Sequence, residues 1–104
     1  MYKFKASVKS DFISQTGTNL SVKGLNGKVI LKPQDSAEFE KEQDDKTLTF
    51  TLTPSSLGTE KRSVKVEVKN GTENTTTSAA GWEVQITASS DLVEISVEAT
   101  EEFH

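Results

Sequence analysis

Residues 46–58 read KTLTFTLTPSSLG, and threonine occupies every second position from Thr47 to Thr53. A repeat of two residues places one kind of side chain on each face of an extended strand. The apolar residues in the gaps therefore predict a face that packs into a core. The threonines predict an exposed face, because threonine favours strands and its hydroxyl is satisfied by water. That exposed face is either plain solvent surface or a surface that docks a partner.

The same alternation recurs along the chain, at 2–9, 64–69, 82–88 and 93–99, with shorter apolar segments at 20–22, 29–31 and 37–39. Gly24-Leu25-Asn26-Gly27 separates two of the short segments and predicts a hairpin, since Asn-Gly tolerates positive φ. Nearly every predicted strand is apolar on one face only, which favours antiparallel sheets with one wet face. We therefore predict an all-β fold, an antiparallel β-sandwich of about seven to eight strands with immunoglobulin-like topology. A small barrel or a jelly roll is the alternative.

Composition sets the limits of this fold. The chain has 104 residues, which predicts a single domain over 1–104, and its 33% hydrophobic content predicts a thin core. The net charge of −4 argues against a nucleic-acid partner, which would require a basic surface. No apolar segment approaches the roughly 18 residues needed to span a membrane, so we expect no membrane insertion. Without cysteine, the chain forms no disulfide.

The alternation also predicts which side chains are buried. We expect the threonines at 47, 49 and 51 to be mostly exposed. The residues expected to be mostly buried are Leu48, Phe50, Leu52, Val64, Val66, Val68, Trp82, Val84, Ile86, Val93, Ile95 and Val97.

An acidic cluster surrounds a predicted connection between two strands, at Glu38, Glu40, Glu42, Asp44 and Asp45. Carboxylates brought together can bind calcium, which prefers several oxygen ligands. The Asp-x-Asp-x-Asp-Gly spacing of a calcium loop is missing, however. A solvated connection is therefore the favoured interpretation.

Residues 70–81, NGTENTTTSAAG, lie between two predicted strands and are long for a hairpin connection, where about two to five residues are usual. Small polar residues without an aromatic residue or arginine make a poor binding hot spot. We therefore predict a loop that is flexible or becomes ordered on a partner, rather than one that recognises a ligand. Its candidate docking residues are Asn70, Asn74, Thr75, Thr76 and Thr77.

No arrangement of residues predicts catalysis. The single histidine, His104, is the last residue, so a Ser-His-Asp arrangement would depend on a chain end as its base. No phosphate-binding glycine loop and no His-Glu-x-x-His spacing is present. We expect a non-enzymatic protein with no cofactor and no metal.

Two segments carry a family resemblance. Residues 31–39, LKPQDSAEF, resemble the turn-and-strand motif of bacterial and bacteriophage Ig-like modules, apolar-x-Pro-Gly-x-Ser-x-x-Phe, with Gln34 at the glycine position. Residues 51–58, TLTPSSLG, are similar to segments of Bacteroidetes-type Ig-like repeats. The resemblance covers less than half of the chain, and it implies a fold and no activity.

Two functions follow as hypotheses. The main one is a structural accessory protein of a virus particle, a bacteriophage capsid-decoration or neck and tail protein, because the chain is rich in threonine and serine yet begins without an export signal. Such a protein is made in the host cytoplasm, is located in the virion, and has capsid or tail proteins as partners. The alternative is a carbohydrate- or cell-surface-binding Ig-like adhesion module.

Charged residues at the two ends of the chain suggest a docking surface for such partners. Lys3, Lys5 and Lys9 form a positive stripe on the first predicted strand, whereas the last strand and tail are acidic, at Glu94, Glu98, Glu101 and Glu102. If the stripes face different sides, neighbouring copies could use them as complementary patches. The alternative is that the lysines protect an edge strand from unwanted pairing.

Overall fold

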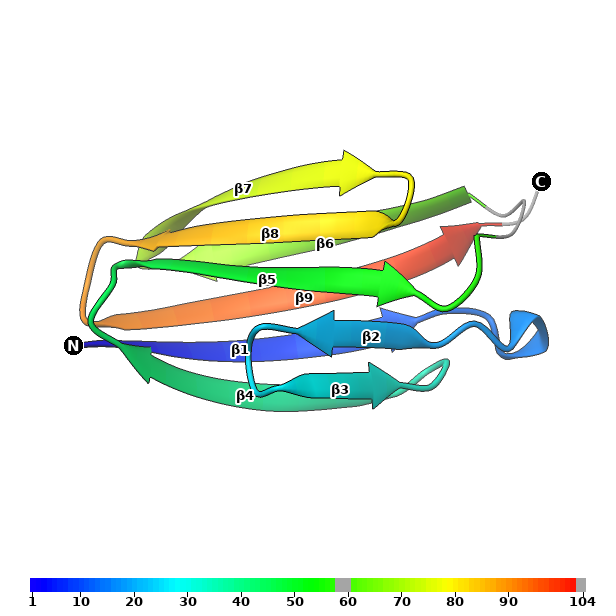
Figure 1. Cartoon of the computed structure of the whole chain (residues 1–104), viewed down its shortest axis with the longest axis horizontal. Coiled ribbons are helices and arrows are strands. Elements are labelled where there is room, and N and C mark those ends of the chain that lie inside the picture. Colours follow the sequence, from blue (N-terminus) through cyan, green and yellow to red (C-terminus); the bar gives the residue numbers. More distant parts are fainter. Residues whose placement is uncertain (58–60, 103–104) are drawn as a thin grey trace.

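The computed structural model describes residues 1–57 and 61–102, which form nine β-strands and one short 3₁₀ helix (Figure 1). The helix η1 is Ser14–Thr16, and no helix in these ranges is long and apolar enough to cross a membrane. The strands are β1 (Tyr2–Asp11), β2 (Leu20–Lys23), β3 (Lys28–Leu31), β4 (Ser36–Gln43), β5 (Thr47–Pro54), β6 (Lys61–Lys69), β7 (Gly71–Ser78), β8 (Gly81–Ala88) and β9 (Leu92–Glu102).

The strands form two sheets, which confirms the predicted all-β sandwich. One sheet has four strands in the order β4-β1-β9-β6, and the other has five in the order β3-β2-β5-β8-β7. Every pairing between the described strands is antiparallel except that of β1 with β9, which is parallel. These two strands come from opposite ends of the sequence, so no tight turn forces them to run in opposite directions.

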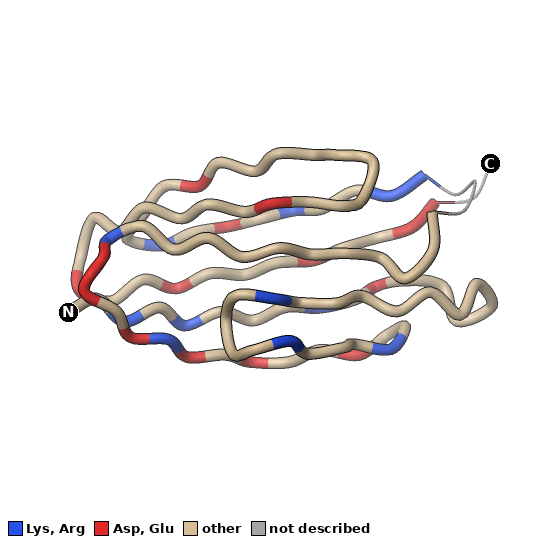
Figure 2. The backbone as a smooth tube through the Cα atoms, in the orientation of Figure 1, with Lys and Arg blue, Asp and Glu red and all other residues tan. Residues whose placement is uncertain are grey.

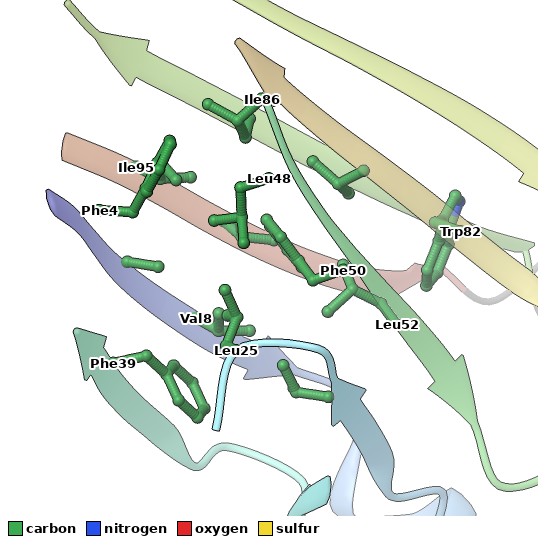
Figure 3. Packing of buried hydrophobic residues seen from close by; sticks show 14 of the residues in the cluster. Phe4, Val8, Leu25, Phe39, Leu48, Phe50, Leu52, Trp82, Ile86 and Ile95 are labelled. Carbon is green, nitrogen blue, oxygen red and sulfur yellow. The ribbon is translucent and has the colours of Figure 1, made fainter. Parts of the chain in front are cut away.

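The core lies between the sheets and is built from the inward residue of each alternating pair (Figure 3). Phe4 and Val8 of β1 face Phe50 and Leu52 of β5 across this layer, and all four are at most 1% exposed. Phe12, which the sequence pattern left unassigned, is fully buried after the end of β1. One continuous cluster therefore holds both sheets together.

Most of the predicted core is confirmed, and the exception is β6. Trp82 is buried, at 6% exposed, as are the predicted core residues of β5, β8 and β9. Val64, Val66 and Val68 are partly buried and pack against the core cluster, so they are less buried than the other predicted core residues. The reason is that β6 is the edge strand of its sheet, where the opposite sheet covers it incompletely. Among the threonines, Thr49 is exposed, whereas Thr47 and Thr51 are half-buried.

The prediction of a loop over residues 70–81 is also wrong. Residues 71–78 form β7, which pairs along its whole length with β8, from Gly71 opposite Ala88 to Ser78 opposite Gly81. Only Asn70, with φ 65°, and the two residues between Ser78 and Gly81 lie outside these strands. The segment lacks apolar alternation because it forms a sheet edge whose side chains are mostly exposed on both faces.

The predicted hairpin at 24–27 and the turn of the 31–39 motif are both present. Residues 24–27 join β2 to β3, and Leu25 within this turn is buried, at 5% exposed. In the turn at 32–35, Gln34 has φ 70°, in the left-handed region that favours glycine. Its side-chain amide donates a hydrogen bond to the carbonyl oxygen of Phe12 at 2.7 Å. This bond helps to hold a glutamine where Ig-like modules carry glycine.

The molecule is elongated, with principal extents of 42 × 20 × 18 Å. All strands run roughly along the long axis (Figure 1). Because β1 and β9 are parallel, the start of β1 and the end of β9 lie at opposite ends of this axis.

Candidate binding face

The outer face of the five-stranded sheet is almost entirely polar, and we call it the threonine face. Its side chains come from every second residue of each strand, opposite to the buried set. It consists of Thr47, Thr49, Thr51 and Thr53 of β5, Glu83, Gln85 and Thr87 of β8, Thr72, Asn74, Thr76 and Ser78 of β7, Ser21 and Lys23 of β2, and Lys28 and Ile30 of β3.

The register of the strands arranges these side chains in rows. Thr49 lies opposite Gln85, which lies opposite Asn74, so hydroxyl and amide groups form one row across three strands. A parallel row joins Thr47, Thr87 and Thr72 in the same way. Neighbouring strands are about 4.8 Å apart, and successive residues on one face of a strand are about 7 Å apart. The face is thus a regular grid of hydrogen-bonding groups.

Three side chains of this grid have no hydrogen-bond partner among the described residues. In the part of the chain that the structure describes, the side chains of Thr49, Gln85 and Asn74 make no hydrogen bond within the protein. Charges are also sparse on this face, where Glu83 lies opposite Thr51 and the two lysines, Lys23 and Lys28, lie opposite each other on β2 and β3. Figure 2 marks the charged positions along the backbone. A polar, mostly uncharged ligand therefore meets few competing charges here.

A shallow hollow of about 180 Å³ lies on the threonine face beside the β7–β8 turn, lined in part by Thr53, Ser78 and Glu83. Gly81 is also part of its lining, and its φ of 145° is a conformation that favours glycine. A Cβ atom on residue 81 would collide with the backbone carbonyl oxygen of Leu52. Glycine at position 81 is therefore required by the close approach of β8 to the backbone of β5.

The lysine stripe lies on the opposite side of the molecule, on the outer face of the four-stranded sheet. β1 is not an edge strand, because it lies between β4 and β9. Lys5 is opposite Glu40 on one side and Glu94 on the other, and Glu94 is opposite Lys69. The Lys3 and Lys5 ammonium groups each lie 3.7 Å from a carboxylate oxygen of Glu40.

The premise that the positive and negative stripes face different sides is therefore wrong. They are adjacent strands of one sheet, and their charges alternate across it. Whether Lys3, Lys5 and Lys9 dock a partner stays a prediction, but their charges are largely balanced by their own neighbours.

This arrangement predicts the effect of reversing a charge. Lys5→Glu would place three carboxylates in one row, at positions 40, 5 and 94, so we expect a lower melting temperature that salt partly restores. The matched control is Lys28→Glu, because Lys28 lies opposite Lys23 and its reversal relieves a like-charge pair. Thermal unfolding followed by circular dichroism tests both variants. An equal loss for the two variants would mean that the charge rows have no influence on stability.

The structure separates the other candidate docking residues. Asn74 and Thr76 lie on the threonine face, whereas Thr75 and Thr77 are on the opposite face of β7. Asn70 lies at the far end of β7, in the β6–β7 corner, where its side-chain amide donates to the Leu92 carbonyl oxygen at 3.1 Å. Two of the five residues therefore belong to one binding surface.

A buried ion pair, which the sequence patterns did not reveal, closes one end of the sandwich. Arg62 and Glu101 are opposite each other on β6 and β9, and an arginine Nη2 lies 2.9 Å from Glu101 Oε2. Their side chains are only 9% and 0% exposed. Glu101 Oε1 accepts a hydrogen bond from the Ile13 backbone N–H at 2.9 Å, and the guanidinium donates to the Ser56 carbonyl oxygen and the Thr18 hydroxyl.

The guanidinium also lies over the ring of Phe12, 5.6 Å from its centroid. The expectation that Glu101 belongs to an exposed acidic tail is wrong. The carboxylate continues the inward-facing positions of β9 after Ala99. This site is structural, since the groups around the carboxylate satisfy one another.

The acidic segment 38–45 forms part of β4 and the turn after it. Glu38, Glu40 and Glu42 point outward from β4, and the Asp45 carboxylate accepts the Thr47 backbone N–H at 2.9 Å. Within the described ranges, no three residues among His, Cys, Asp and Glu are grouped so that they could hold a metal ion. His104 and Phe103 lie outside the described residues.

Comparison with known proteins yields one structural relative. The fold is similar to that of a bacterial adhesin from Mobiluncus mulieris that contains intramolecular disulfide, isopeptide and ester bond cross-links, with a TM-score of 0.56 and 15% sequence identity. The similarity covers 99% of this chain and 42% of the adhesin chain, so this protein spans less than half the length of its relative. At this identity, the likeness concerns the fold alone. No protein-family model and no curated protein matches the sequence.

Proposed function

We propose that this chain is a non-enzymatic adhesion module that binds a carbohydrate-bearing surface through its threonine face. The observation that carries the proposal is the row of free hydroxyl and amide groups at Thr49, Gln85 and Asn74, on a face with few charges. Carbohydrate hydroxyls both donate and accept hydrogen bonds, and threonine hydroxyls and side-chain amides do the same. Flat polar surfaces of this kind form wet contacts of moderate affinity.

The adhesin relative supports this proposal over the virus-particle role that the sequence suggested. That adhesin has a fold similar to this one over 99% of this chain. No feature of the described structure favours the bacteriophage capsid or tail role in the same way.

A glycan array with the purified protein tests the proposal. The test variant is the triple replacement Thr49→Ala, Gln85→Ala and Asn74→Ala, which removes one row from the threonine face. We expect binding to weaken by about tenfold or more, since each net hydrogen bond contributes on the order of 1 kcal/mol.

The matched control removes small polar groups from the other sheet, with Ser7→Ala and Ser96→Ala, which are outward-facing neighbours on β1 and β9. This control should bind as the wild type does, and circular dichroism should show that both variants are folded. Absence of glycan binding by the wild type, or equal binding by the triple variant, would contradict the proposal.

A further inference from the structure

The five-stranded sheet ends at β7, and no strand among the described residues lies beside its outer edge (Figure 1). Alternate residues of an edge strand present backbone N–H and C=O groups that lack partners within the sheet. Such an edge is a template for another strand, so proteins usually protect it with charges, proline, bulges or a short length.

The other three sheet edges have this protection. β3 is only four residues long. β4 carries outward glutamates at 38, 40 and 42, and β6 carries lysines at 61, 65 and 69. By contrast, β7 has eight residues, GTENTTTS, with no lysine, no proline and a single charge at Glu73. Its threonines favour extended structure.

We propose that β7 pairs in antiparallel orientation with β7 of a second copy of this chain. A two-fold axis perpendicular to the sheet keeps the inner faces of both copies on the same side. Even-numbered residues then lie opposite even-numbered residues, and odd-numbered opposite odd-numbered. An axis through Thr75 gives nearly full overlap of residues 71–78. It sets Thr75 opposite its counterpart and Asn74 opposite Thr76.

Charge favours a second copy as the occupant of this edge. In the register centred on Thr75, Glu73 lies opposite Thr77 of the other copy, so the two carboxylates do not face each other. Threonine pairs across strands are stabilising, whereas directly opposed like charges are destabilising. The strand is therefore complementary to itself, which the charged β4 and β6 edges are not.

The dimer would have one continuous sheet of ten strands. The row of Thr49, Gln85 and Asn74 would continue through Thr76 and Glu83 of the second copy, because Thr76 is opposite Glu83 in each copy. The two threonine faces would then form a single surface on one side of the dimer. This pairing goes beyond the proposed function and does not depend on it.

Sedimentation over a wide range of protein concentration tests the pairing, with the dimer as the expected species at high concentration. Asn74→Lys combined with Thr76→Lys would place lysines opposite each other, and we expect the dissociation constant of the dimer to rise about tenfold or more. The matched control, Thr49→Lys with Thr51→Lys, puts the same charges on the same face of β5 inside the sheet, and it should dimerise as the wild type does.

A mixing experiment checks both folding and register. The corresponding double glutamate variant at positions 74 and 76 should also be monomeric alone, and an equal mixture of the lysine and glutamate variants should restore the dimer. A wild type that stays monomeric at the highest concentration overturns the proposal. A dimer weakened equally by the β5 control, or not weakened by the lysine variant, also overturns it.

The lack of cysteine in the chain allows a second test. Thr75→Cys would lie opposite its counterpart, at a separation of about 4.5–5.5 Å between Cβ atoms, close to the range in which a disulfide forms. We expect mild oxidation to give a covalent dimer with this variant and not with Thr72→Cys, which would face Ser78. Equal cross-linking of the two variants would exclude the register centred on Thr75.

Discussion

Replacement of Trp82 by alanine is expected to lower the free energy of unfolding by about 3–5 kcal/mol. Trp82 is the first inward-facing residue of β8, lies opposite Leu52 of β5, and is 6% exposed. It fills one end of the core (Figure 3), so alanine would leave a cavity there. Small domains are stable by only about 5–15 kcal/mol, so this loss is a large fraction of the total.

Urea denaturation followed by far-ultraviolet circular dichroism measures this loss, because the variant lacks the only tryptophan of the chain. Trp82→Phe is the matched variant and should lose clearly less, since most of the apolar volume remains. A change of less than about 1 kcal/mol for Trp82→Ala would mean that the ring does not belong to the core.

Glu101→Ala is expected to destabilise the protein by a similar amount, about 3–5 kcal/mol, because it breaks a buried ion pair by removing one member. The guanidinium of Arg62 would lose the carboxylate that accepts a hydrogen bond from Nε at 2.9 Å and lies 2.9 Å from Nη2. The Ile13 backbone N–H would lose its acceptor as well. Chemical denaturation of the purified variant gives the loss.

The double variant Arg62→Met with Glu101→Leu is the control for this prediction. Replacing both members of a buried pair with apolar residues is often neutral or stabilising. We therefore expect the double variant to be more stable than Glu101→Ala. The single variants Arg62→Met and Glu101→Leu complete the comparison. If the double variant lost as much free energy of unfolding as these two single variants together, the pair would not act as a unit.

The sequence predicted the strands whose apolar and polar residues alternate, because burial on one face leaves that signature. It did not predict β7, whose composition is that of a turn. The inward-facing positions of β7 at Glu73, Thr75 and Thr77 are not apolar, because this edge is not fully covered. Only the pairing with β8 reveals this strand, and pairing is a long-range property.

The position of β1 and the burial of Glu101 also differ from the sequence-based expectation. β1 lies in the middle of its sheet, and no local sequence pattern specifies which strands become neighbours. The burial of Glu101, by contrast, could have been predicted. It belongs to the same series of alternate positions on β9 as Val93, Val97 and Ala99, which are buried. A carboxylate in that series requires a buried partner, and Arg62 has the corresponding position on β6.

Of the candidate site, only the threonines of β5 could be predicted from the sequence as a possible docking surface. The contributions of β7 and β8 became visible only with the register, since Gln85 and Asn74 join Thr49 across strands that are far apart in the chain. The lysine stripe was identified correctly as a set of outward residues. Its neutralisation by β4 and β9 depends on strand order and could not be predicted.

The parallel pairing of β1 with β9 also determines how the protein responds to mechanical force. Tension applied through residues before β1 and after β9 would pull these two adjacent strands in opposite directions along their length. The paired segments, 3–11 on β1 and 92–100 on β9, would then be loaded in shear, so that their hydrogen bonds must yield together and not one after another. Forced unfolding is governed by the height of this barrier and not by equilibrium stability. The fold is therefore suited to transmit tension along its long axis between the points attached at its two ends.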